Sequence, residues 1–228
     1  MNPAMVLVAA DDGDHRRSQA LHDVARMTAR QAEATVWPAF GAPQEIVATI
    51  ESISGPRVLL PTFLVGGDPA SADVCAQLAP PLRGDVLAND PLGPTPALVA
   101  DLAHRLTEAG WRHNDGVVLV ADGARNGQAR REVAQAARML GQRLDTPVHI
   151  AHARRGVSSA RTAVHRLRRS GYRRIALAPW QLVSAGTQAD TELAAAGADV
   201  VAAPLWPSER VVETLLAQHR LARARLAV

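Results

Sequence analysis

Lysine is absent from the sequence, cysteine occurs once and aromatic residues make up only 3% of it, and each shortage removes a class of structure or function. The single cysteine, Cys75, excludes a disulfide bond within the chain and suits the reducing cytoplasm. No apolar run approaches the roughly 18 residues that a membrane-spanning helix needs, and no signal peptide is visible. The sequence therefore predicts a cytoplasmic protein with no membrane partner.

Positive charge is carried by arginine alone, since all 25 basic residues are arginines and the net charge is +3. The arginines form no block of like charge, and few aromatic residues lie among them, so nucleic acid is not expected as a partner. Apolar residues make up 47% of the chain, and most of them are Ala, Val and Leu. A chain of 228 residues can bury an aliphatic core in one large domain or two small ones.

One pattern of a strand followed by a loop occurs twice in the sequence. The apolar run 5–10 leads into the polar, glycine-containing segment 11–15, and the run 117–121 leads into a similar segment, 122–126. Leu7 and Leu119 are 112 residues apart, which is about half of the chain. A short apolar run that ends in a polar turn is typical of a buried parallel strand. The repeat predicts a duplicated domain, with modules at 1–112 and 113–228.

The order of the expected elements supports an α/β fold of two tandem parallel-sheet modules. Strands alternate with helices in both halves, which predicts parallel sheets joined by right-handed crossovers. The loops that follow the strands then lie at the carboxyl edge of each sheet, where ligands bind in open α/β folds. The pattern predicts strands at 5–10, 35–40, 57–65, 85–88, 117–121, 148–152 and 174–183, a segment at 199–205 that matches 85–92, and helices at 17–31, 44–53, 72–78, 94–108, 126–143, 158–169 and 211–225.

The strand Arg57-Val-Leu-Leu-Pro-Thr-Phe-Leu64 and the segment Asp90-Pro-Leu-Gly-Pro-Thr-Pro96, together with the duplication, resemble the sirohydrochlorin chelatase family. The likeness is to the long, two-module form, which is related to the anaerobic cobalt chelatases, and it covers essentially the whole chain. It implies that the two modules face a central cleft. A polycarboxylate tetrapyrrole would bind there and receive Fe²⁺ or Co²⁺ as a substrate in sirohaem or cobalamin synthesis, with no tightly bound cofactor.

The sequence departs from this family at its two metal-ligating histidines. The family has one at the end of the first strand and one shortly after the third, and Ala10 and Pro69 stand there in this chain. The matching positions of the second module, Asp122 and Thr187, do not supply them either. Neutral imidazole is the usual ligand for such metals. Two hypotheses follow: a lyase that inserts metal with carboxylates in place of histidine, or an inactive homologue that binds or carries a tetrapyrrole or acts as a partner protein.

Three acidic or imidazole side chains are the candidate metal ligands. Asp11 and His15 lie in the first loop, and Asp68 follows the third strand and is expected to approach them. Carboxylates with one imidazole would hold a divalent metal weakly, and Asp11 and Asp68 would also be the catalytic residues. Alternatively, the acidic residues of this loop cap the first helix.

The candidate substrate-binding residues are glycines and arginines of the loops. Gly13, Gly66, Gly67 and Gly123 fit a backbone that approaches a ligand, or alternatively a tight turn. Matching strands are followed by Arg16 and Arg17 in the first module and by Arg125 in the second. Guanidinium groups pair well with the carboxylates of a macrocycle, although each of these arginines is alternatively a solvated surface charge.

Three further residues have a functional and a structural interpretation. Trp180 could stack on a macrocycle or pack in the core. His149 and His152 lie three residues apart on a strand, so their side chains point to opposite faces and a shared metal is the weaker interpretation.

Overall fold

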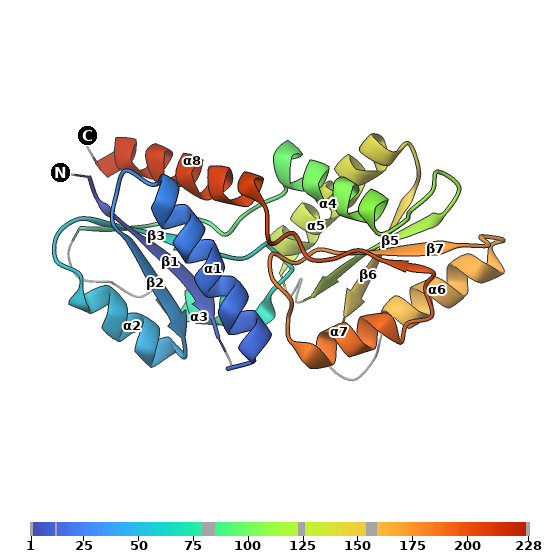
Figure 1. Cartoon of the computed structure of the whole chain (residues 1–228), viewed down its shortest axis with the longest axis horizontal. Coiled ribbons are helices and arrows are strands. Elements are labelled where there is room, and N and C mark those ends of the chain that lie inside the picture. The colour runs from blue at the N-terminus through green and yellow to red at the C-terminus, as the bar shows by residue number, and fades with distance from the viewer. Residues whose placement is uncertain (1, 12, 79–84, 123–125, 154–158, 227–228) are drawn as a thin grey trace. The chain divides into compact units, whose positions relative to one another are not determined.

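The computed structural model describes residues 2–11, 13–78, 85–122, 126–153 and 159–226. It contains two four-stranded parallel sheets with alternating helices, and this confirms the expected α/β class (Figure 1). Within the described ranges, no helix combines the length and the apolarity needed to cross a membrane.

The first sheet is built around β1 (Ala4–Ala10), whose residues from Met5 to Ala9 are buried. Such an unbroken apolar run is expected of a strand that has helices on both faces. The strand order is β2 (Val36–Gly41), β1, β3 (Arg57–Pro61) and β4 (Val86–Ala88), and all neighbours are parallel. The helices after β1, β2 and β3 are α1 (His15–Gln31), α2 (Pro43–Ser52) and α3 (Pro69–Leu78).

The second sheet repeats this order around β5 (Gly116–Asp122). Its strand order is β6 (Val148–Ala153), β5, β7 (Ile175–Pro179) and β8 (Val200–Val201), again with parallel neighbours. The helices after β5, β6 and β7 are α5 (Gly127–Leu144), α6 (Ser159–Arg169) and α7 (Thr187–Ala194). The same strand order in both sheets agrees with the sequence repeat.

The two remaining helices are exchanged between the compact units of the chain. One unit comprises 1–63, 70–92 and 207–228, and the other comprises 64–69 and 93–206. Helix α4 (Pro96–Glu108) thus packs in the unit of the second sheet, and α8 (Glu209–Leu226) packs in the unit of the first (Figure 1). The boundary between residues 112 and 113 stays a prediction about the sequence repeat, whereas the compact units are discontinuous in sequence.

Three side chains determine where helices begin. Asp14 caps α1 by accepting hydrogen bonds from the backbone N–H groups of residues 16 and 17, and Asn126 caps α5 by accepting one from residue 129. These two caps are 112 residues apart, so the repeat extends to the cap positions. Thr95 caps α4 in the same way. Because a capping residue lies outside the helix it starts, α5 begins at Gly127 and α4 at Pro96.

The expected strands at 57–65 and 174–183 were too long, since β3 ends at Pro61 and β7 at Pro179. Proline has no N–H group for the ladder, so strand pairing stops near it. The next residue of each segment still donates its N–H to the central strand, Thr62 to Val8 and Trp180 to Val120, at 2.8 Å in both cases. The apolar residues beyond these points are buried in loops, which explains why the apolar runs outlast the strands.

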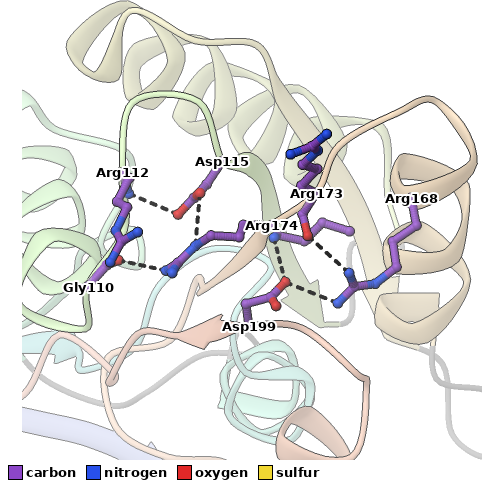
Figure 2. Close-up of polar contacts among 8 residues, drawn as sticks. Gly110, Arg112, Asp115, Arg168, Arg173, Arg174 and Asp199 are labelled. Carbon is purple, nitrogen blue, oxygen red and sulfur yellow. Dashed lines mark hydrogen bonds and ion pairs between the residues drawn. The ribbon is translucent and has the colours of Figure 1, made fainter.

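Two Arg–Asp pairs fix the amino-terminal ends of β5 and β7 (Figure 2). Buried Asp115 lies 3.2 Å from the Nε atom of Arg174, and Asp199 accepts from Arg168 at 3.0 Å and from the backbone N–H of Ile175 at 2.9 Å. Each carboxylate thereby also orders its neighbouring loop. This cluster lies at the edge of the second sheet opposite the carboxyl ends of its strands, and we assign it a structural role.

Candidate functional site

The carboxyl end of β1 is held in place by a buried arginine of α1. Arg17 is only 5% exposed, and its Nε and Nη2 atoms donate to the carbonyl oxygen of Ala10 at 3.2 and 2.9 Å. The hydroxyl of Ser71, on α3, accepts from the Ala10 N–H at 2.8 Å and from Arg17 Nη2 at 3.4 Å. One guanidinium and one hydroxyl therefore fasten the end of β1 to two helices, at the residue where the family resemblance expects a metal-ligating histidine.

Asp11 uses both of its carboxylate oxygens within the first loop. Oδ1 accepts the backbone N–H of Gly13 at 3.0 Å, and Oδ2 accepts the hydroxyl of Ser18 at 2.5 Å. Gly13 has a φ of 83°, a conformation that favours glycine, and a Cβ atom there would meet nothing within 4 Å. The half-buried carboxylate of Asp11 thus shapes this turn, and Gly13 meets a conformational need of the same turn.

The next three residues of this loop have different environments. Asp14 is the helix cap, as the structural alternative predicted. His15 and Arg16 are the first two residues of α1, and both are exposed. Arg16 makes no side-chain hydrogen bond or ion pair to another residue of the described ranges. Its guanidinium is therefore available to an anionic ligand, whereas Asp11, five residues earlier, already has two donors.

The loop after β3 is packed against the end of β7. Trp180 is fully buried, and its Nε1–H donates to the carbonyl oxygen of Val65 at 2.9 Å. A Cβ atom at Gly67 would overlap the carbonyl oxygen of Trp180 and lie 3.2 Å from its carbonyl carbon. Gly66 has a φ of 74°, so it needs glycine for its conformation, and Gly67 needs it for close packing. The core interpretation of Trp180 is therefore right.

Asp68, the second candidate carboxylate, is half-buried and directly precedes α3. It belongs to the segment 64–69 of the second compact unit, while Asp11 belongs to the first. Their approach to one another stays a prediction.

In the second module, the candidate residues Arg125 and Gly123 lie outside the described residues. On β6, His149 is exposed and His152 is half-buried.

A comparison with protein families gives a match. Residues 116–220 match the CbiX family model, and this matched segment begins at β5 and ends within α8. The matched segment covers 105 of the 228 residues and most of the second half of the chain. It confirms the resemblance to the chelatases seen in the sequence. No curated protein matches the chain significantly.

Solved structures show the same fold over nearly the whole chain. SirB from Bacillus subtilis with Fe³⁺ has a TM-score of 0.73 and 15% sequence identity, over 99% of this chain and 97% of its own. DR2241 from Deinococcus radiodurans, a multi-domain protein with structural similarity to chelatases, has a TM-score of 0.62 and 18% identity. That match covers 95% of this chain and 54% of DR2241. At these identities the likeness concerns the fold alone.

Among the described residues, no three His, Cys, Asp or Glu side chains lie close enough to share an ion.

Arg17 was expected beside Arg16 as a cleft residue, but it is buried and bonds to the Ala10 carbonyl oxygen. The structural roles of Arg17 and Ser71 were not predicted. The burial of Arg17 could have been predicted from its position. It lies four and seven residues before Leu21 and Val24, so it shares their buried face of α1. An arginine in the buried phase of an amphipathic helix needs polar partners, which here are Ala10 and Ser71. Ser71 has no comparable signal.

Proposed function

We propose that this protein, whose second half matches a chelatase family, binds a polycarboxylate tetrapyrrole at the carboxyl ends of its strands, as a binding or carrier protein. The observation that carries the proposal is the contrast within the first loop. The Asp11 carboxylate accepts bonds from Gly13 and Ser18, while the exposed guanidinium of Arg16 has no partner in the described part of the chain. A loop with an engaged carboxylate and an available guanidinium suits a ligand that brings its own carboxylates.

The anchoring of the backbone next to Arg16 favours the same interpretation. Arg17 and Ser71 hold the end of β1, and Asp14 fixes the first turn of α1, so the backbone on both sides of Arg16 is ordered before a ligand arrives. Preorganisation lowers the entropy lost on binding. Each charge-assisted pair that is shielded from water contributes roughly 1.5–3 kcal/mol, so a few such pairs would give a macrocycle useful affinity.

A second candidate function is insertion of Fe²⁺ or Co²⁺ into that tetrapyrrole, and the match to the chelatase family model favours it. In this case the divalent ion is a substrate, held weakly by Asp11 and Asp68, with His15 nearby in sequence. To ligate an ion, Asp11 would have to share oxygens that now accept from Gly13 and Ser18. We therefore expect an affinity for Co²⁺ no better than micromolar, about −8 kcal/mol.

The test is an absorbance titration of the full chain with sirohydrochlorin, without metal and then with Co²⁺. Saturable binding is expected, and Arg16→Ala should weaken it about tenfold, which corresponds to one pair of roughly 1.4 kcal/mol. Arg30→Ala is the matched control, because Arg30 is also exposed but lies in the last turn of the same helix. The same titration with Arg125→Ala tests the arginine expected from the second module.

The outcomes separate the two candidates. No saturable binding by the wild type would refute the tetrapyrrole proposal, and equal affinities for Arg16→Ala and Arg30→Ala would refute the role of Arg16. A metallated spectrum that develops with Co²⁺ and is lost in Asp11→Ala and Asp68→Ala would establish insertion. Tetrapyrrole binding without that spectral change would support the carrier function and exclude insertion of Co²⁺.

A further inference from the structure

We propose that Trp180 is the positioning residue for the glycine loop 64–69, which carries Asp68. This loop follows β3 of the first sheet, yet it belongs to the compact unit of the second sheet. Two of the contacts that hold it come from Trp180, just beyond β7. The inference concerns the conformation of the loop, and only its consequence for ligand binding rests on the proposed function.

Two contacts of different kinds act on the loop from one residue. The Nε1–H of Trp180 donates to the carbonyl oxygen of Val65, and two residues later the backbone of Gly67 packs on the carbonyl group of Trp180. The loop is also closed internally, because the Gly67 N–H donates to the carbonyl oxygen of Leu64 at 2.9 Å. The side chain and the main chain of Trp180 therefore hold successive parts of one turn.

The internal repeat shows that this arrangement is specific to one module. Trp180 and Thr62 occupy the same place after their strands, because each donates its N–H to the central strand of its sheet. The hydroxyl of Thr62 bonds to the carbonyl oxygen of Leu60, within its own segment. Replacing a short hydroxyl side chain by an indole at this position gives the second module a donor that reaches a loop more than a hundred residues away in sequence.

This attachment acts on the backbone next to Asp68. Asp68 comes directly after Gly67, so release of the loop from Trp180 is expected to move the backbone that carries its carboxylate. A ligand that uses Asp68 or the backbone of Gly66 would then have to order the loop as it binds, which lowers its affinity. Trp180 is thus expected to act on ligand binding without touching the ligand, since it is fully buried.

Hydrogen–deuterium exchange of the full chain, measured by mass spectrometry, tests the positioning role directly. Trp180→Phe keeps most of the apolar surface and removes the donor to Val65. Amides of residues 64–68, the Gly67 N–H above all, should exchange about tenfold faster, while β5 keeps its protection. Trp206→Phe is the matched control, because Trp206 is buried in the same unit and makes no side-chain hydrogen bond to another residue of the described ranges.

Unchanged exchange of residues 64–68 in Trp180→Phe, or an equal increase in Trp206→Phe, would overturn the inference. Sirohydrochlorin titration of both variants then tests the consequence, and only Trp180→Phe should bind more weakly. If the wild type binds no tetrapyrrole, the proposed function fails while the exchange result still decides the role of Trp180. If Trp180→Phe does not fold, Gly67→Ala displaces the same loop with the indole present, and unchanged exchange of residues 64–68 in that variant would equally refute the inference.

Discussion

Replacing Arg17 by methionine should destabilise the first compact unit by about 2 kcal/mol. The change removes a guanidinium that is only 5% exposed and leaves the carbonyl oxygen of Ala10 without the two donors it accepts at 2.9 and 3.2 Å. A buried acceptor that loses its partners costs roughly 1–3 kcal/mol. Arg17→Lys keeps the charge but offers a single ammonium in place of the fork, so we expect roughly half of that loss.

Ser71 supplies a second variant for the same site. Ser71→Ala leaves the N–H of Ala10 without its acceptor at 2.8 Å and should cost about 1–2 kcal/mol. Because Arg17 and Ser71 share both Ala10 and a contact of their own at 3.4 Å, the double variant should cost less than the sum of the single variants.

Urea unfolding followed by circular dichroism measures these changes in the free energy of unfolding. Arg16→Met is the control, because Arg16 is the exposed neighbour of Arg17 on the same helix and should change stability by less than about 0.5 kcal/mol. The reasoning is refuted if Arg17→Met is as stable as Arg16→Met, or if the losses of Arg17→Met and Ser71→Ala simply add.

Two further predictions concern pH and helix caps. Burial lowers the pKa of His219, whose Nε2 donates to the carbonyl oxygen of Pro3 at 3.0 Å. As the pH falls, the imidazole is therefore protonated in the unfolded chain before it is protonated in the folded one. The free energy of unfolding should accordingly fall as the pH drops below 6.5. In urea unfolding at several pH values, His219→Gln should flatten that acid slope, and equal slopes would contradict the assignment. Asp14→Ala and Asn126→Ala should each lower the free energy of unfolding by about 1 kcal/mol, with Asp14→Asn close to the wild type; full stability of both alanine variants would show that the caps are dispensable.

Much of the fold could be predicted because local pattern and tertiary structure agree along most of the chain. The apolar run at 5–10 and its copy at 117–121 are the central strands, and the Asp14 and Asn126 positions recur with the repeat. Helix α7 is the element without a sequence signal, and none of its residues is buried. A helix that fully buries no side chain has little apolar periodicity to detect.

The candidate site was less predictable, because its geometry depends on partners that are distant in sequence. The role of Asp14 follows from its place before a helix, whereas that of Arg17 needs Ser71, 54 residues away. Gly66 and Gly67 look alike in sequence, but one has a positive φ and the other packs against Trp180. The two central carboxylates, Asp11 and Asp68, belong to different compact units, which no local pattern could indicate.

The exchange of α4 and α8 makes the two halves of the sequence dependent on each other for folding. A fragment that ends at residue 112 carries α4 without β7 and α5, against which that helix packs, and it lacks α8, which packs on β3 and α1. A gene cut at the repeat boundary would thus yield two fragments that each expose an uncovered sheet face and an unpartnered helix. Co-expressed, the two fragments are expected to complement each other as a pair, because each supplies the helix that the other lacks.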